Sequence, residues 1–407
     1  MITSISIVQQ KLDRVPKAYK QTKEDLEELN DPENAAPKYK AIIEASDDSI
    51  EMFQLDEEDT VMCCCRAGHL GSVDMIVYNP VHQEFFFHHG MELPFLPLSA
   101  TSFAFTPQSE RAEGAYIAIT GFSSEIEIYN LNEMDQIRPD CVLAQGKYIK
   151  KTQTQINNPI GHKGDVIGST WSQLHPNIIA TCSSDASVKF WDLAGLSCLT
   201  TLENVHVGGI NNILFCETKE QTFITSGLAD QSIKLFDFTQ QLDFIKQVNI
   251  GKNIEQVRFF GDLLLATTED GYLALVDILQ EKVLQIVQIY KDVPITALTT
   301  RANLIVAGSP ESHDIKVLKC VDNQLVPVTE FNISEPCFSA EFGIDKSGFM
   351  LFCGLGNNRM KAINIFAKLT KECVHEVFGV DRAQFLKFKD LSLNLEGEGG
   401  DDDSDVE

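Results

Sequence analysis

Three histidines between residues 82 and 89 are the strongest candidates for metal chemistry. His88 and His89 follow a run of phenylalanines, and His82 lies just upstream. A zinc site needs further histidine, cysteine or carboxylate ligands, and none stands at suitable spacing. Adjacent side chains on a strand also point to opposite faces of a sheet, which separates His88 from His89. We therefore predict no metal site and no cofactor.

A glycine-rich stretch from Gly354 to Arg359 (GLGNNR) is the best candidate for phosphate binding. It lacks the final glycine of a phosphate-binding loop, and no helical pattern follows it. A turn between two strands is the better interpretation. The chain also has no GxSxG, no HExxH and no paired catalytic carboxylates. We predict that it is not an enzyme.

Eleven cysteines raise the question of disulfides or metal ligands. The sequence contains no CxxC pair, and Cys63, Cys64 and Cys65 are consecutive, so on a strand they would alternate faces. We interpret the cysteines as buried, reduced thiols of an intracellular protein. No apolar stretch is long enough to span a membrane, and the start lacks the pattern of a signal peptide.

Lys147, Lys150 and Lys151 form a basic cluster that could contact RNA or an acidic partner. A solvated loop is the commoner role of such a cluster. The formal net charge of −26 also argues against sequence-independent nucleic-acid binding by the whole surface.

The clearest structural pattern of the chain lies in residues 161–192. A Gly-His pair ending at His162 precedes a Trp-Asp pair beginning at Trp191. An apolar run, a polar turn containing Asp185 and an alternating run lie between the two pairs. This pattern is typical of a WD40 blade, a four-stranded unit that cannot bury its faces alone.

The polar residues of this blade predict a buried structural network. We expect His162, Asp185 and Trp191 to be joined in a hydrogen-bonded chain, because buried polar groups need partners. The bridging hydroxyl would come from Thr181 or Ser183. Such a network holds a sheet together and contacts no partner.

Six weaker copies of the blade appear when the chain is aligned on this one. In the next copy His206, Asp230 and Phe236 take the corresponding places, and Asp270 precedes Val276 at the same offset. The seven copies end at residues 78, 129, 191, 236, 276, 318 and 365. Their spacing fits blades of roughly 40–45 residues, with insertions in the first two intervals. Seven blades are enough to close a ring.

We therefore predict an all-β protein, a seven-bladed WD40 β-propeller with a short N-terminal extension and a disordered acidic C-terminal tail. The boundaries assign 1–50 to an N-terminal arm with short helical segments, 51–385 to the propeller and 386–407 to the tail. Within that tail, Ser404 stands among acidic residues and is a candidate phosphorylation site. A plain solubilising tail is the alternative interpretation.

The order of the less regular motifs resembles the periodic tryptophan protein family, the branch named for its first member. The opening MITSISIVQQKLDRVPKAYKQTKEDLEELN is similar to the family's start, with Pro16, Lys17 and Tyr19 in a Pro-Lys-x-Tyr element. The first-blade stretch with its His-His pair, the second blade GAYIAITGFSSEIEIYN and the closing HEVFG also match. The chain departs at Ile7, Gln9 and Gln10, where the family carries a Trp and basic residues.

The resemblance implies a non-enzymatic scaffold of ribosome biogenesis in the nucleus and nucleolus, acting in large-subunit precursor assembly and pre-rRNA processing. We expect a monomer within a larger complex, with proteins of pre-ribosomal particles as partners and pre-rRNA or histones as further candidates. The candidate partner contacts are Ile7, Pro16, Lys17, Tyr19, Lys147, Lys150 and Lys151.

Two other functions stay open. A histone- or chromatin-associated scaffold would suit the acidic surface, because histone tails are basic. A substrate receptor of a ubiquitin ligase would need an adaptor-binding helical motif outside the ring.

Overall fold

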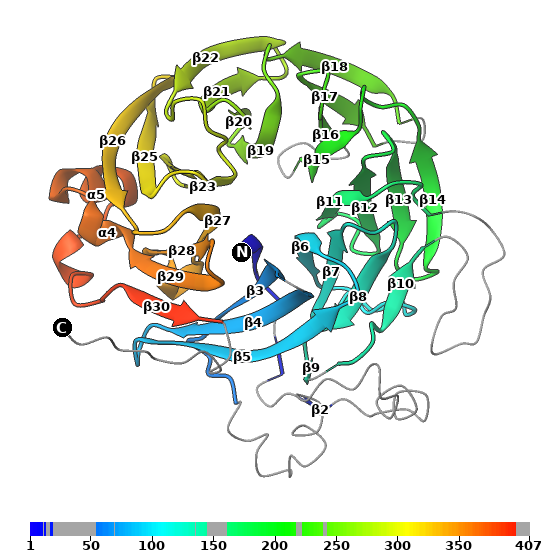
Figure 1. The fold of residues 1–407 in the computed structure, drawn as a ribbon, viewed down its shortest axis with the longest axis horizontal. Coiled ribbons are helices and arrows are strands. Elements are labelled where there is room, and N and C mark those ends of the chain that lie inside the picture. The colour runs from blue at the N-terminus through cyan, green and yellow to red at the C-terminus, as the bar shows by residue number, and fades with distance from the viewer. Residues whose placement is uncertain are drawn as a thin grey trace, which may run out of the picture.

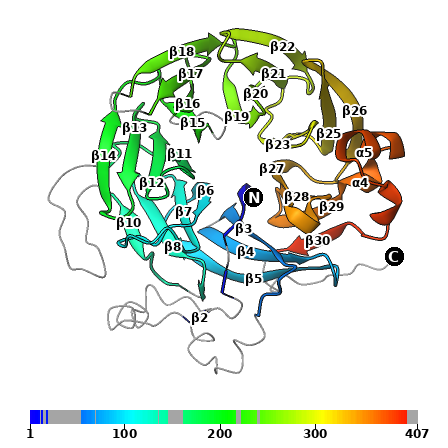
Figure 2. The same ribbon diagram turned by 180° about the vertical axis from the view of Figure 1, so that it is seen from behind.

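The computed structural model describes residues 1–10, 12–13, 17–18, 54–68, 70–134, 136–144, 161–216, 222–238 and 242–395. These residues form seven four-stranded antiparallel sheets, arranged as blades around a central channel (Figures 1 and 2). The predicted all-β, seven-bladed WD40 propeller is confirmed. In the described part of the chain, no helix has the length and apolar character needed to cross a membrane.

The strands of each blade follow one another in chain order from the channel outward. Blade 1 contains β1 (Ile2–Ile7), β3 (Thr60–Ala67), β4 (Gly71–Asn79) and β5 (Glu84–Leu93). Blade 2 contains β6 (Pro97–Phe103), β7 (Tyr116–Gly121), β8 (Ile126–Asn130) and β10 (Cys141–Leu143). Blade 3 contains β11 (Val166–Trp171), β12 (Ile178–Ser183), β13 (Val188–Asp192) and β14 (Ser197–Leu202). Blade 4 contains β15 (Ile210–Phe215), β16 (Thr222–Gly227), β17 (Ser232–Asp237) and β18 (Phe244–Asn249).

The remaining blades follow the same order. Blade 5 contains β19 (Ile254–Phe260), β20 (Leu263–Thr268), β21 (Tyr272–Asp277) and β22 (Lys282–Gln288). Blade 6 contains β23 (Ala297–Arg301), β24 (Leu304–Gly308), β25 (Asp314–Val321) and β26 (Gln324–Asn332). Blade 7 contains β27 (Cys337–Phe342), β28 (Met350–Leu355), β29 (Arg359–Asn364) and β30 (Leu391–Asn394).

A few short elements lie outside the blade sheets. The strands β2 (Lys17–Ala18) and β9 (Glu133–Met134) form a parallel pair. Blade 7 carries the 3-10 turns η2 (Asp345–Ser347) and η3 (Arg382–Gln384) and the helices α4 (Ile365–Lys368) and α5 (Lys371–Phe378).

The second and third strands of each blade are the most apolar, because neighbouring blades cover both of their faces. The strands β4, β7 and β28 are buried along their whole length, whereas the outer strand β22 has only exposed and half-buried residues. Six of the seven predicted blade ends fall within third strands, and the seventh, Ile365, directly follows β29. The GLGNNR stretch spans the turn between β28 and β29, as predicted, with its first two residues in β28 and Arg359 in β29.

The ring begins and ends outside the range 51–385 that the sequence assigned to it. The N-terminal segment supplies β1, which pairs with β3 from Ile2 opposite Arg66 to Ile7 opposite Met62. At the other end, β30 pairs with β29 as the outer strand of blade 7. Each blade needs four strands to bury its faces, which places both segments inside the propeller. The predicted arm helices and Ser404 lie outside the described residues.

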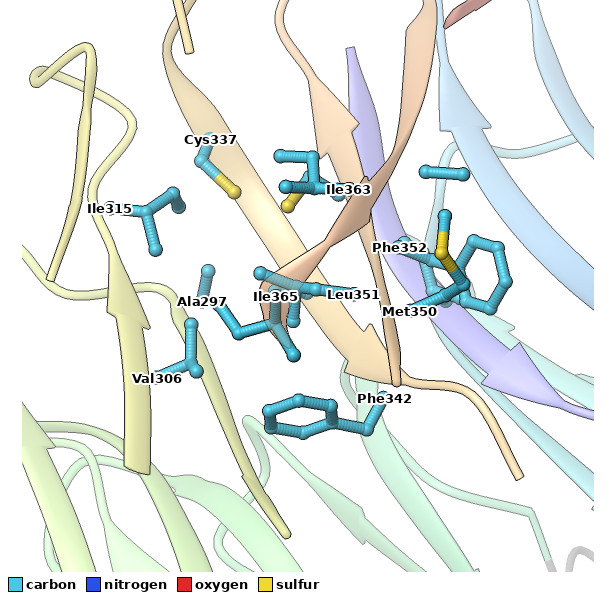
Figure 3. Packing of buried hydrophobic residues seen from close by; sticks show 14 of the residues in the cluster. Ala297, Val306, Ile315, Cys337, Phe342, Met350, Leu351, Phe352, Ile363 and Ile365 are labelled. Carbon is cyan, nitrogen blue, oxygen red and sulfur yellow. The ribbon is translucent and has the colours of Figure 1, made fainter. Parts of the chain in front are cut away.

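The largest apolar cluster lies where blades 6, 7 and 1 meet, and it joins the two ends of the chain. Successive side chains of β28 point to opposite faces, so they pack alternately against blade 6 and blade 1 (Figure 3). Leu351 points toward Ala297 and Val306 of blade 6, and Phe352 contacts Tyr78 of blade 1 at 5.5 Å between ring centroids. Packing across blades, together with the inserted strand β1, therefore closes the ring.

Candidate functional site

The predicted residues of blade 3 meet in one buried hydrogen-bonded chain. The indole N–H of Trp191 donates to Thr181 Oγ1 at 2.9 Å, and His162 Nε2 lies 2.8 Å from the same oxygen. Because the ionised Asp185 carboxylate can only accept a hydrogen bond, neutral His162 accepts the Thr181 hydroxyl proton at Nε2 and carries its own proton on Nδ1. That nitrogen lies 3.3 Å from Asp185 Oδ2. Of the two hydroxyls considered from the sequence, Thr181 is the bridge.

Two serines complete the turn around this network. Ser183, the other candidate hydroxyl, accepts a hydrogen bond from the backbone N–H of Asp185 at 3.1 Å. Ser187, which the sequence reasoning missed, donates to Asp185 Oδ1 at 2.6 Å and lies 3.0 Å from His162 Nδ1. An Asp-x-Ser spacing recurs in blade 4, and it was the available signal for this residue.

Blade 4 repeats the network without its last member. His206 Nδ1 lies 2.8 Å from Asp230 Oδ2, and its Nε2 lies 2.8 Å from Thr225 Oγ1. Phe236 replaces the tryptophan and stacks on Phe223 with ring centroids 5.1 Å apart. The polar chain therefore ends at the threonine, and apolar packing takes the place of the final hydrogen bond.

Blade 5 keeps the aspartate, to which Thr268 donates at 2.7 Å, but it has neither the histidine nor the tryptophan of the network. Lys252 Nζ lies 2.6 Å from Asp270 Oδ2, and its ammonium group lies 3.8 Å from the centroid of the Tyr272 ring. This ion pair lies at the surface, so water screens it, and such pairs contribute little to stability.

The blade 3 network pairs a neutral histidine with an ionised aspartate, and this arrangement stabilises the fold. Burial lowers the pKa of His162, and its contacts with Asp185 offset this only in part, so the ring is neutral. Burial would raise the pKa of Asp185, but hydrogen bonds from His162, Ser187 and the Lys163 amide outweigh it and hold that pKa well below its usual range. Because the side chain of His162 is fully buried, it cannot reach a partner.

The candidate contacts near the N-terminus divide into a buried and an exposed residue. Ile7 is buried at the end of β1 and joins the cluster between blades 7 and 1, so it faces protein. Lys17 is exposed in β2. Its backbone N–H donates to the Asn132 carbonyl at 2.8 Å, and the Asp13 N–H donates to Asn132 Oδ1 at 2.7 Å. Asn132 thus fixes this stretch to blade 2.

The other candidate contacts lie outside the described residues. They are Pro16, Tyr19, Lys147, Lys150 and Lys151.

The adjacent histidines of β5 correct the expectation that their side chains point to opposite faces. The pairing of β4 with β5 is irregular at this point, because Met75 lies opposite His89 and Ile76 lies opposite Phe87. His88 is thus the extra residue of a β-bulge, which changes the direction of its side chain. The two rings converge, with their Nδ1 atoms 2.7 Å apart. Burial lowers the pKa of His89 to about 3.

The consecutive cysteines alternate between the two faces of β3, as predicted. Cys64 packs in the cluster shared with blade 7, whereas Cys63 and Cys65 pack in the cluster shared with blade 2. All three are free thiols and fully buried. Burial raises the pKa of Cys63 to about 12, so the thiolate needed for reaction is suppressed.

The central channel forms a cavity with a volume of about 1000 Å³. Hydroxyl and amide side chains line it together with apolar ones, and its Arg258 Nη1 pairs with Glu341 Oε1 at 2.9 Å. Within the described ranges, no group of three or more histidine, cysteine or acidic side chains is placed to hold a metal ion.

Similarity to proteins of known sequence covers parts of the chain. No protein-family model matches it. It is 28% identical over 174 residues to a periodic tryptophan protein 1 homologue of Drosophila melanogaster, covering 42% of this chain and 36% of the relative. It is 25% identical over 207 residues to periodic tryptophan protein 1 of Saccharomyces cerevisiae, covering 47% and 36%. An uncharacterised WD repeat-containing protein of Schizosaccharomyces pombe is 29% identical over 155 residues, covering 37% and 30%.

The chain thus spans about a third of the length of the curated relatives it matches. Among solved structures, the RRP9 WD40 repeats match 73% of this chain and 84% of their own, with a TM-score of 0.53 at 16% identity. U3-55K matches 73% and 85%, with a TM-score of 0.51 at 16% identity. These structures share the fold. The resemblance found in the sequence is confirmed, and the chain is a divergent WD40-repeat protein similar to periodic tryptophan protein 1.

Proposed function

We propose that this protein is a non-enzymatic scaffold of ribosome biogenesis that holds assembly partners on precursors of the large subunit. The observation that carries the proposal is the similarity to periodic tryptophan protein 1 of fly and yeast. Its working location is then the nucleus and nucleolus, and its partners are proteins of pre-ribosomal particles. The rigid ring supports this role, because a scaffold must hold its contacts at fixed positions.

The binding surface of the proposed scaffold includes the stretch around Lys17. Its exposed side chain lies on a backbone fixed to blade 2 by Asn132, so it is already positioned for a partner. A pre-positioned contact loses less conformational entropy on binding than a free one. Pre-rRNA is a further candidate for contact with this surface and with Lys147, Lys150 and Lys151.

Sedimentation of the tagged full-length chain tests the proposal. On a sucrose gradient of cell extract, we expect it to travel with precursor large subunits, and a fluorescent fusion should concentrate in nucleoli. Asn132→Ala removes the side-chain acceptor of the Asp13 amide and should weaken this association. Asn332→Ala on the outer strand of blade 6 is the matched control, and it should leave sedimentation unchanged.

Sedimentation only as free protein would contradict the proposal. Salt-sensitive capture of histones without ribosomal proteins would instead favour the chromatin scaffold, because a chain with a net charge of −26 attracts basic histone tails.

A further inference from the structure

One pocket of the described chain combines an aromatic interior with a basic rim. It lies between the turn joining β4 to β5 in blade 1 and the helical insertion of blade 7, which spans residues 365–390 between β29 and β30. Its volume is about 340 Å³. The lining residues are Pro80, Val81, Gln83, Lys346, Phe349, Phe385, Lys387 and Phe388. In Figure 1, β30 and β5 lie side by side where the ends of the ring meet.

The interior of the pocket is apolar and its shape is fixed. Phe349 is buried, and its ring lies 4.5 Å from Phe388 and 5.1 Å from Phe385 between centroids. Val81 closes one side and is 63% exposed. An aromatic interior beside an exposed aliphatic residue is suited to one bulky apolar side chain of a ligand.

The helical insertion is held to the ring by specific polar contacts. Asn364 Nδ2 donates to the Phe385 carbonyl at 2.7 Å and to the Phe388 carbonyl at 3.0 Å. Arg382 donates to the carbonyls of Phe366 and Ala367, each at 2.8 Å. These bonds position both pocket phenylalanines before any ligand arrives, which reduces the entropy lost on binding.

The rim carries two lysines in a chain whose net charge is −26. Lys346 is paired with Glu58, a carboxylate of the segment that leads into β3. Glu58 therefore compensates the charge of this lysine. Lys387 is exposed, forms no ion pair with the described residues, and lies 5.1 Å from the centroid of the Phe388 ring. One cation at the pocket mouth is therefore available to an anionic ligand.

We propose that this pocket binds an acidic peptide segment of a partner protein. The peptide inserts one bulky apolar side chain between the phenylalanines and places a carboxylate on Lys387. Charge complementarity selects an acidic partner, and the anchor pocket demands an apolar residue within the acidic run. The site lies apart from Asn132 and Lys17, so its ligand does not depend on the proposed role in ribosome biogenesis.

Fluorescence anisotropy with labelled peptides tests this site on the full chain. The probes are acidic octapeptides of Asp and Glu in which a single Phe is moved through the sequence. The control peptides replace Phe by Ala, or replace Asp and Glu by Asn and Gln. We expect binding only when the anchor and the acidic groups are both present.

Lys387→Glu should weaken binding about tenfold or more, because it reverses a charge that contacts the ligand. The matched control is Lys371→Glu, which makes the same charge change on exposed α5, away from the pocket lining. It should change the affinity less than about threefold, through the long-range field alone. Val81→Trp fills the exposed side of the pocket and should also abolish binding, while circular dichroism reports an unchanged fold.

Equal losses for Lys387→Glu and Lys371→Glu would overturn the proposal, because they would indicate attraction by general charge. Absence of binding by every probe at about 1 mM would also overturn it. So would a dimer in analytical ultracentrifugation that dissociates on Lys387→Glu, since the occupant would then be a second copy of the chain.

Discussion

Blades 3 and 1 share one architecture but are stabilised in different ways. Blade 3 is continuous in sequence and contains the network from Trp191 to Asp185. Blade 1 takes its inner strand from residues 2–7 and its second strand from residues 60–67, and one of its polar contacts is the pair of Arg66 with the buried Asp74 at 2.8 Å. A four-stranded blade can therefore be stabilised either by a local polar network or by an apolar strand from a distant part of the sequence.

The two kinds of stabilisation also differ in how they tolerate substitution. The network requires a particular donor or acceptor at each position, because an unpaired polar group in the interior is costly. The inserted strand requires apolar residues of suitable volume, and several residue types would serve. Substitutions in blades 1, 3, 4 and 5 test this contrast, beginning with the largest effect.

Ile2→Ala should lower the free energy of unfolding by about 3 kcal/mol, because Ile2 is fully buried in the cluster between blades 7 and 1. Urea denaturation followed by tryptophan fluorescence measures this change. Ser4→Ala on the same strand is the control, and it should stay within about 0.5 kcal/mol. A loss below about 1 kcal/mol for Ile2→Ala would mean that β1 is not part of the cooperative core.

Thr181→Val in blade 3 should destabilise the fold more than Thr225→Val in blade 4. The first leaves both His162 Nε2 and Trp191 Nε1 without a partner, at about 3 kcal/mol. The second leaves only His206 Nε2 unpaired, at about 1.5 kcal/mol. Urea denaturation of the two variants gives the difference. Equal losses would show that the tryptophan does not extend the network energetically.

His162→Gln should reduce the dependence of stability on pH below neutrality. The pKa of His162 is lowered in the folded protein, chiefly by burial, so the unfolded chain takes up more protons as the pH falls. Stability therefore decreases as the pH falls below the ordinary histidine value of about 6.5. Urea midpoints across this range should fall less steeply for the variant. The exposed His82→Gln is the control and should keep the slope of the parent chain.

Lys252→Met in blade 5 should leave the urea midpoint unchanged within error. The ion pair of Lys252 with Asp270 lies at the surface, where water screens the attraction. A clear loss of stability would show that blade 5 keeps a working network despite lacking the histidine. The same denaturation series measures this variant beside the two threonine variants.

The sequence predicted the ring well where side-chain chemistry constrains it. The positions of Asp185 and Asp230 gave the repeat register, and six predicted blade ends lie in third strands. The sequence left open whether Thr181 or Ser183 supplies the bridging hydroxyl, because both residues carry a hydroxyl group near the same strand end. Ser187 was missed, since a serine in a polar turn has many ordinary roles.

The sequence was a poorer guide to which residues lie at the candidate binding surfaces. Ile7 was assigned to a partner contact, yet it is buried in the ring. His88 and His89 were separated by strand alternation, yet a β-bulge brings them together. The aromatic pocket joins residues 80–83 with residues 346–388, and no local pattern links those segments.

Residue types and spacing alone were enough to predict the fold class, the number of blades, the chain from His162 to Trp191 in blade 3, and His206 and Asp230 in blade 4. They were enough because buried histidine, aspartate and threonine need particular partners at fixed offsets. The closure of the ring, the direction of the adjacent histidines and the segments that form the pocket became clear only in three dimensions. These features arise from apolar packing and backbone irregularity between distant residues, and many sequences satisfy such contacts equally well.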